Sequence, residues 1–218
     1  MLTIAIDGPS ASGKTTTARA VARRLGYRYI DSGALYRALA VKALRRGVDA
    51  DDLDRVRALL GETDADYAPD GTIELDGVPE SASLREPRVS DYASRLSVHS
   101  PVRDWVNRRL RAAVEGGGVV MEGRDIGTVV LPDADVKIFL QASIEVRAER
   151  RRRDLGAAGH RGSRADVAGD LERRDRRDSG REVAPLAVAP DAVVIDGSAL
   201  TFEEQVEAVL AEVARKGP

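Results

Sequence analysis

The sequence contains no cysteine and only two histidines among its 218 residues. The lack of cysteine excludes disulfides and thiolate-ligated metals, and it is compatible with a reducing compartment. No apolar run approaches the roughly 20 residues that a membrane-spanning helix needs. The first residues also lack the basic and apolar regions of a secretion signal. We therefore expect a cytoplasmic protein that makes no membrane contact.

The chain also lacks a strong excess of charge of either sign. Its 34 basic and 36 acidic residues give a formal net charge of −2. This balance argues against a protein that binds nucleic acid through its overall charge. Hydrophobic residues make up 43% and charged residues 32%, which is typical of a globular chain and not of a disordered one. The length suffices for one domain with a sizeable core.

Histidines and aromatic residues carry little functional signal. His99 and His160 belong to no recognisable motif, and we expect loop or surface positions for both. We expect Trp105, Phe139 and Phe202 in the core, because large aromatic side chains are usually buried. No cluster of His, Cys, Asp and Glu has metal-ligand spacing, so no metal site built from protein ligands alone is predicted.

Short apolar runs alternate with helical patterns along most of the chain. The predicted strands cover residues 2–6, 27–30, 119–121, 136–140 and 192–195, and the predicted helices cover 15–25, 34–46, 143–154, 164–177 and 202–215. Thr201 and Glu204 form a capping-box pattern at the start of the last helix. The alternation predicts an α/β fold with a parallel sheet. Turn signals in residues 67–79 predict a small antiparallel insertion.

Residues 8–15 read GPSASGKT and fit the G-x-x-x-x-G-K-[ST] pattern of a phosphate-binding loop. Glycine lets the backbone approach a triphosphate closely, and the following helix adds partial positive charge. The loop follows a predicted strand and opens a predicted helix, a setting that distinguishes it from an ordinary glycine-rich turn. It predicts binding of ATP with Mg²⁺. The predicted ATP-binding residues are Gly8, Pro9, Ser10, Ala11, Ser12, Gly13, Lys14, Thr15 and Thr16, with Thr15 as the Mg²⁺ ligand.

Further segments make the chain resemble the bacterial cytidylate kinase family over nearly its whole length. They are residues 7–16, 31–37 (DSGALYR), 92–95 (YASR), 122–130 (EGRDIGTVV) and 181–186 (REVAPL). The GRDIGT segment, with Ser94 and Arg103 upstream, is far more specific than the phosphate loop, which marks only a superfamily. The family often has glycine where this chain has Thr15, which still satisfies the general pattern.

The resemblance implies a P-loop NTPase-type five-stranded parallel sheet flanked by helices, a small monophosphate-binding insertion and an arginine-rich lid. It implies a single kinase domain, with a core of about residues 1–33, 101–150 and 184–218, a monophosphate-binding region of about 34–100 and a lid of about 151–183. The implied reaction transfers the γ-phosphoryl group of ATP to CMP or dCMP. We expect these small molecules as partners, no nucleic acid, and a monomer.

The chemistry of cytosine constrains the acceptor site. Its exocyclic amine needs an acceptor such as a carboxylate, whereas uracil presents a carbonyl at the same place. The resemblance assigns Asp125 to this amine, and Arg103 and Ser94 to the base. An alternative for Asp125 is an ion pair with Arg124 at the end of a strand.

The acceptor phosphate calls for arginines, which are permanently charged and bind two oxygens at once. The resemblance assigns Asp178 to the ribose hydroxyl, while surface positions remain the alternative for Arg37 and for most lid arginines. The predicted catalytic residues are Lys14, Arg124, Arg174 and Arg181. The resemblance implies these substrate-binding residues: Ser32, Tyr36, Arg37, Ser94, Arg103, Gly123, Arg124, Asp125, Arg174, Asp178 and Arg181.

Two alternative functions stay open at this point. One is a P-loop kinase with another acceptor, such as UMP, AMP or a small metabolite. The other is an NTP-binding regulatory or nucleic-acid-binding module that uses the arginine clusters. Phosphoryl transfer to CMP would separate the leading hypothesis from both.

Overall fold

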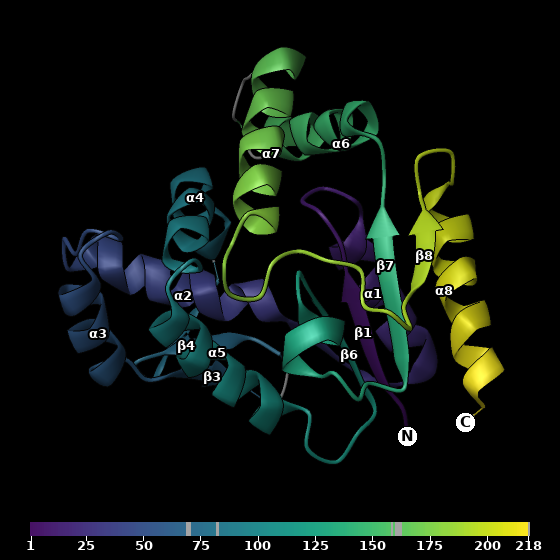
Figure 1. The fold of residues 1–218 in the computed structure, drawn as a ribbon, viewed down its shortest axis with the longest axis horizontal. Coiled ribbons are helices and arrows are strands. Elements are labelled where there is room, and N and C mark those ends of the chain that lie inside the picture. The colour runs from purple at the N-terminus through teal and green to yellow at the C-terminus, as the bar shows by residue number, and fades with distance from the viewer. Residues whose placement is uncertain (69–70, 82, 158, 160–162, 218) are drawn as a thin grey trace. The chain divides into compact units, whose positions relative to one another are not determined.

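The structure is a computed structural model that describes residues 1–68, 71–81, 83–157, 159 and 163–217. The chain divides into two compact units (Figure 1). The first consists of Met1–Tyr29 and the chain from Gly117 onward, and the second of Ile30–Gly116. The finer boundaries expected for core, monophosphate-binding region and lid stay predictions.

A five-stranded sheet of order β2-β6-β1-β7-β8 is the framework of the first unit. Its strands are β1 (Thr3–Asp7), β2 (Arg28–Asp31), β6 (Val119–Gly123), β7 (Val136–Gln141) and β8 (Val193–Asp196). The pairs β1–β6, β1–β7 and β7–β8 are parallel. The predicted α/β class and parallel sheet are therefore confirmed, and each predicted strand lies within a few residues of its observed place.

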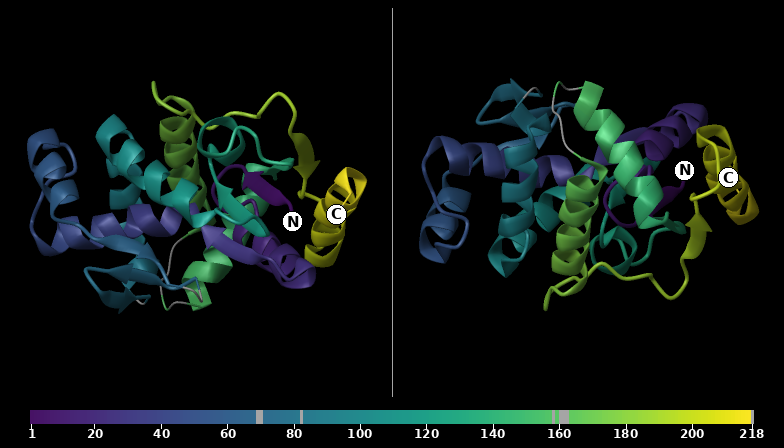
Figure 2. Two further views of the ribbon diagram at one scale, coloured as in Figure 1. Left: turned by 90° about the horizontal axis from the view of Figure 1, so that it is seen from below. Right: turned by 90° about the horizontal axis from the view of Figure 1, so that it is seen from above.

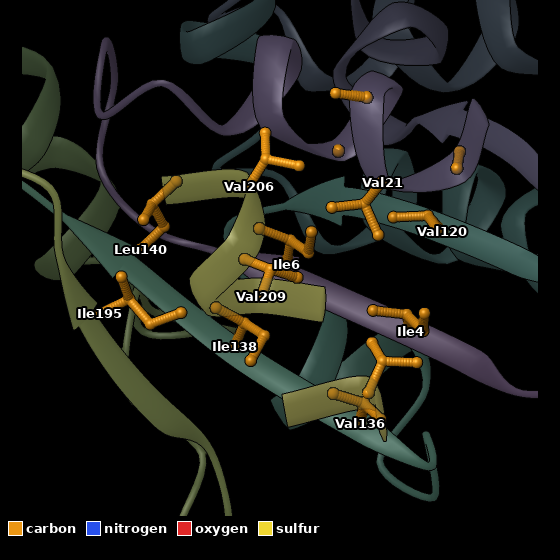
Figure 3. Close-up of a cluster of buried hydrophobic side chains, with 14 residues drawn as sticks. Ile4, Ile6, Val21, Val120, Val136, Ile138, Leu140, Ile195, Val206 and Val209 are labelled. Atoms are coloured by element: carbon orange, nitrogen blue, oxygen red, sulfur yellow. The ribbon is translucent and has the colours of Figure 1, made fainter. Parts of the chain in front are cut away.

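Two helices cover one face of this sheet. They are α1 (Lys14–Leu25) and α8 (Phe202–Lys216), which lie side by side in both views of Figure 2. Alternate strand residues point to the same face, so Ile4, Ile6 and Ile138 meet Val21 of α1 and Val206 of α8 in one buried cluster (Figure 3). Full burial of each large aliphatic side chain contributes about 1.5–3 kcal/mol. This cluster anchors the strand ends from which the site loops emerge.

The arginine-rich segment forms two helices, α6 (Ile144–Ala157) and α7 (Arg164–Ser179), also in the first unit. They pack on each other through Ala148, Val167 and Leu171, which are at most 4% exposed. Ala11 packs against the same cluster. The helix pair therefore has a small core of its own, and this core contacts the phosphate loop.

The second unit is mainly helical, with a small sheet. Its elements are α2 (Ser32–Arg45), α3 (Leu53–Gly61), β3 (Ala65–Tyr67), β4 (Ile73–Leu75), β5 (Val78–Glu80), the 3₁₀ turn η1 (Ser83–Arg85), α4 (Pro87–Leu96) and α5 (Ser100–Ala113). The strands β3, β4 and β5 pair antiparallel, which confirms the predicted insertion. The sequence patterns did not predict α3, α4 and α5.

One prediction about the core was wrong. Trp105 and Phe139 are buried as predicted, but Phe202 is 51% exposed. Phe202 is the first residue of α8, one turn before Val206, where the contacts of that helix with the core begin. His99 lies at the start of α5 with Nε2 2.7 Å from the carbonyl oxygen of Ala50, and the prediction for His160 falls outside the described residues. None of the helices in the described part of the chain has the length and apolarity that crossing a bilayer requires.

The predicted capping box at the start of α8 is present and can be tested. The Thr201 hydroxyl accepts the Glu204 N–H, and the Glu204 carboxylate accepts the Thr201 N–H at 2.8 Å. Thr201→Ala removes the first of these bonds and should lower the free energy of unfolding by about 1 kcal/mol. Urea denaturation measures this loss. A change within a few tenths of a kcal/mol, comparable to a neutral surface substitution, would contradict the assignment.

Candidate active site

The phosphate loop of residues 8–15 connects β1 to α1 and needs glycine at two positions. Gly8 has φ +146°, and a Cβ there would lie 2.0 Å from the carbonyl oxygen of Leu140. Gly13 has φ +99° and precedes α1 as its N-terminal cap. The loop thus lies between a strand and a helix, as its interpretation as a phosphate-binding loop requires. Its last residues lie at the positive end of the α1 dipole, where an anion is stabilised.

Lys14 is buried, with only 4% of its surface exposed. Its Nζ donates a hydrogen bond of 2.6 Å to the carbonyl oxygen of Pro9. The pKa of Lys14 is lowered to about 7, chiefly by burial and also by the neighbouring Arg124, while Glu122 and Asp7 act in the opposite direction. The positive charge is therefore costly here without an added anion, and a polyphosphate would stabilise it.

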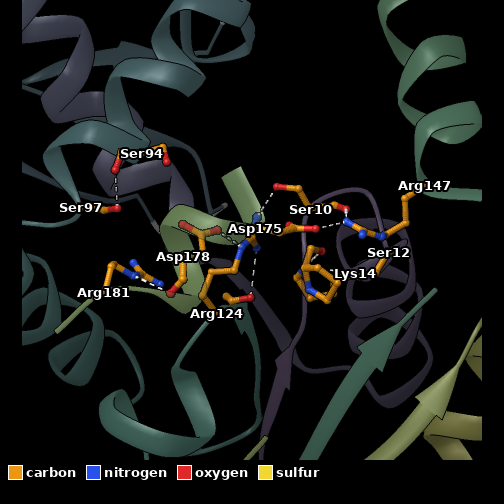
Figure 4. A network of polar contacts seen from close by, with 12 residues as sticks. Ser10, Ser12, Lys14, Ser94, Ser97, Arg124, Arg147, Asp175, Asp178 and Arg181 are labelled. Atoms are coloured by element: carbon orange, nitrogen blue, oxygen red, sulfur yellow. Dashed lines mark hydrogen bonds and ion pairs between the residues drawn. The ribbon is translucent and has the colours of Figure 1, made fainter. Parts of the chain in front are cut away.

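Arg124 links the phosphate loop to the end of α7 (Figure 4). Its NH2 donates to Ser10 Oγ at 2.7 Å, and its Nε donates to Asp178 Oδ2 at 3.0 Å. Only 8% of the Asp178 side chain is exposed, against 24% for Arg124. The alternative considered for Asp125 was an ion pair with Arg124. In the structure, Arg124 forms its ion pair with the carboxylate of Asp178.

The other lid residues predicted for the site lie near the end of α7. Arg181 is 9% exposed and its Nε donates to the carbonyl oxygen of Asp178 at 3.1 Å. Arg174 is half-buried on α7. Arg173 and Arg176 are exposed and pair with acidic residues of their own helix, which agrees with the surface alternative kept for most lid arginines.

Two arginines of α6, the buried Arg147 and the half-buried Arg150, contact the loop and were not among the predicted site residues. Arg147 NH1 donates to the carbonyl oxygen of Ser10 at 3.2 Å and to Asp175 Oδ2 at 2.5 Å. Arg150 donates to the carbonyl oxygens of Ser12 and Gly197 at 2.8 and 2.9 Å. Their spacing of three residues puts both on one helix face. That spacing was a usable signal within the run of arginines.

Asp125 begins the π-helical turn η2 (Ile126–Val130), which follows β6, and is 5% exposed. The amides of Ile126 and Gly127 donate to the two carboxylate oxygens of Asp7 at 2.8 and 2.7 Å. Asp7 was also missed by the sequence patterns, although it directly precedes the phosphate loop. The pKa of Asp7 is raised to about 6, chiefly by burial and also by the nearby charge of Asp125, while the two amide hydrogen bonds act in the opposite direction.

In the second unit, the predicted base-binding residues come from α4 and α5. Arg103 is 2% exposed, donates to the carbonyl oxygen of Ser97 at 3.2 Å, and lies over the ring of Tyr36 at 5.8 Å. The buried Ser94 hydroxyl has no hydrogen-bond partner among the described residues. Such a buried hydroxyl is costly unless a ligand satisfies it.

The predicted phosphate-binding residues of the second unit lie on α2. Ser32 is 5% exposed at the first position of the helix. Arg37 is half-buried, and its NH2 donates to Asp31 Oδ2 at 2.7 Å. Asp31 holds the guanidinium in place, so Arg37 is not the fully solvated residue of the alternative interpretation.

Within the described residues, no group of three or more His, Cys, Asp or Glu side chains is placed to hold a metal ion. Thr15 is exposed in the first turn of α1, directly after Lys14. A single hydroxyl suits Mg²⁺ that arrives with a nucleotide and keeps most of its waters. The donor set therefore fits a nucleotide-borne ion.

Known proteins are similar to this chain over nearly its whole length. A family model described as cytidylate kinase matches residues 4–215. The chain is 48% identical to the cytidylate kinase of Geobacillus kaustophilus over 212 residues, covering 96% of this chain and 95% of that protein. It is 44% identical to the cytidylate kinase of Pelotomaculum thermopropionicum over 215 residues, covering 97% and 95%.

Solved structures with low sequence identity share the fold. An uncharacterized protein from Eubacterium ventriosum aligns with a TM-score of 0.56 at 11% identity, covering 98% of this chain and 99% of that one. The protein TT1252 of Thermus thermophilus aligns with a TM-score of 0.52 at 18% identity, covering 100% and 98%. These two likenesses support the fold alone.

The pKa of Asp7 can be tested by titration. Its carboxyl should titrate near pH 6 in the folded protein, against an ordinary value of 3.8. The folded state thus binds this proton more tightly than the unfolded state, so the contribution of Asp7 to stability falls as pH rises through this window. The ¹³C carboxyl shift of Asp7, assigned with Asp7→Asn, measures the midpoint. Exposed Asp191, whose pKa is lowered by Lys137, provides the internal comparison. Equal midpoints for the two groups would contradict the assignment.

Proposed function

Because the chain belongs to the cytidylate kinase family, we propose that it transfers the γ-phosphoryl group of ATP to CMP or dCMP, giving ADP and CDP or dCDP. The observation that carries the proposal is the family match over residues 4–215. The loop with its buried lysine and the neighbouring arginines provides the matching chemistry. The proposed partners are these small molecules, and the monomeric state and cytoplasmic location remain predictions from the sequence.

The phosphate loop is proposed to hold the triphosphate of ATP. Its backbone amides and Gly8, Gly13 and Lys14 form the cradle, with Thr15 as the protein ligand of Mg²⁺ and Thr16 beside it. Bound Mg²⁺ would supply positive charge that neutralises part of the charge of the triphosphate. The lowered pKa of Lys14 supports this assignment, since the buried ammonium gains most when an anion arrives.

Phosphoryl transfer needs little covalent chemistry from the protein, so alignment and positive charge dominate. We assign the charge around the transferring group to Lys14, Arg124, Arg174 and Arg181. Arg124 is already oriented by Ser10 and Asp178, which reduces the entropy lost when it binds a phosphate. Asp178 is proposed to accept the ribose hydroxyl with lone pairs that Arg124 does not use.

The acceptor nucleotide is assigned to the residues that the family resemblance implies for its phosphate and base. Ser32, Tyr36 and Arg37 are proposed for its phosphate, and Ser94 and Arg103 for its base. The partnerless Ser94 hydroxyl and the buried Arg103 guanidinium are donors of the kind that cytosine N3 and O2 require. Asp125, which follows Gly123 and Arg124, is proposed to accept the exocyclic amine.

An acceptor panel tests the function. ADP release from ATP and Mg²⁺ is measured in parallel with CMP, dCMP, UMP, AMP and no acceptor. Turnover should be highest with CMP or dCMP, because uracil would place a carbonyl against the Asp125 carboxylate. Asp125→Ala should reduce the preference for CMP over UMP by about tenfold or more. Higher turnover with another acceptor would refute the assigned pocket. ADP release that no acceptor raises above the rate without acceptor would refute the kinase function.

Lys14→Ala tests the phosphate loop. The variant should lower kcat by ~10²–10³-fold, the usual loss when one preorganised charge donor is removed from a transition state. The variant should still fold, because relief of the unfavourable burial of the ammonium offsets part of the loss of its hydrogen bond to Pro9. Lys216→Ala, at an exposed position in the last turn of α8, is the matched control and should keep full activity. Wild-type kcat in Lys14→Ala would exclude this role of the loop.

A further inference from the structure

The first amides of the π-helical turn η2 are capped by Asp7, a residue of β1. The N-terminal cap of a helix usually accepts an amide hydrogen bond with its own side chain. Asp125 occupies this position, yet its side chain makes no cap hydrogen bond. The Ile126 and Gly127 amides donate instead to Asp7, which is 119 residues from Ile126 in sequence.

Asp7 joins two segments of the site. It is the last residue of β1 and lies opposite Gly123 of β6 in the sheet register. The next residue, Gly8, begins the phosphate loop. The two amides that donate hydrogen bonds to Asp7 belong to the residues directly after Asp125. One carboxylate therefore connects the start of the phosphate loop to the backbone that carries Asp125.

The contact requires two acceptor oxygens in a confined space. Asp7 is 5% exposed, and each of its oxygens receives one amide. Asparagine would turn an NH₂ group toward one of these donors. On the other side, a Cβ at Gly127 would lie 3.4 Å from Asp7 Oδ2 and 3.2 Å from Lys137 Cδ. A Cβ at Gly127 would therefore touch the carboxylate at an ordinary contact distance and would crowd the Lys137 side chain.

Burial of this carboxylate has an energetic cost. The pKa of Asp7 is raised to about 6, chiefly by burial, with Asp125 adding to the rise and Lys14 opposing it. The two amide hydrogen bonds offset only part of the cost. A turn of five residues could be capped at lower cost by a side chain of its own, so the arrangement indicates a requirement beyond local stability.

We propose that Asp7 is a positioning residue for acceptor selection: by holding the Ile126 and Gly127 amides, it fixes the backbone that presents the Asp125 carboxylate to the acceptor base. This proposal rests on the function assigned above to Asp125. It explains why capping of η2 is provided from β1, since an Asp125 that capped its own turn would direct its carboxylate at the backbone. Asp7 contacts no substrate in this scheme and acts through Asp125.

The test compares kcat/KM for CMP and for UMP in wild type, Asp7→Asn, Asp125→Ala and the double variant. Asp7→Asn should lower the CMP/UMP ratio by ~10–100-fold, since small displacements of a recognition group cost this much. The KM for ATP should change less than the KM for CMP. The double variant should match Asp125→Ala within about twofold, because both changes remove the same interaction.

Each outcome separates the role of Asp7 from the assigned function. A folded Asp7→Asn with the wild-type ratio, or with equal losses toward CMP and ATP, overturns the positioning role. If Asp125→Ala keeps the wild-type ratio, the base-recognition model of the proposed function fails instead. Thr201→Ala is the matched control, because it destabilises the same unit far from η2 and should leave the ratio unchanged.

A second variant covers the case in which Asp7→Asn does not fold. Asp7→Glu retains both oxygens and the charge but displaces them by one methylene, and it should also lower the CMP/UMP ratio. In the wild-type protein, the Ile126 and Gly127 amide shifts should titrate with the midpoint of the Asp7 carboxyl. An unchanged ratio in Asp7→Glu, or amide shifts that do not follow this titration, would overturn the proposal.

Discussion

The carbonyl oxygens of the phosphate loop place a demand on the rest of the first unit. A loop that turns its amides toward an anion turns its carbonyls toward the protein, and buried carbonyls need donors. Lys14 provides one for Pro9, Arg147 for Ser10 and Arg150 for Ser12. Each donor is a cation, so the groups that satisfy the loop also raise the positive potential around it.

This demand explains why α6 starts where it does. The helix leaves the carboxyl end of β7 (Figure 1). Its first turns place Arg147 and Arg150 against the loop. Arg147 is held in turn by Asp175 of α7, and Ala11 packs on the shared core of the two helices. The arginine-rich helix pair is thus attached to the loop through its buried face, while its outer arginines remain in solvent.

The accumulated positive charge is balanced by buried carboxylates. Asp7 and Glu122 lie at adjacent strand ends, and Asp178 lies at the end of α7. All three raise the pKa of Lys14 and oppose the effect of its burial. Without a nucleotide, these carboxylates keep the charges of the site in partial balance. An incoming polyphosphate would take over that role, which is the electrostatic preorganisation that phosphoryl transfer needs.

The sequence by itself determined the features that depend on local pattern. Glycine spacing and the lysine identified the phosphate loop, alternating apolar runs identified the parallel sheet, and Thr201 with Glu204 identified the start of α8. These signals are readable because backbone geometry and strand or helix periodicity involve residues that are close in sequence. The GRDIGT segment added a resemblance specific enough to indicate the family.

Only the tertiary structure decided which side chains meet. The bonds of Asp7 to Ile126, of Arg147 to Ser10 and of Arg124 to Asp178 join residues 119, 137 and 54 positions apart. No local pattern encodes these contacts, and a run of arginines looks alike whether its members are buried or solvated. Phe202 was misplaced for the same reason, since its apolar character predicts burial but only the position of α8 on the sheet determines what it can pack against.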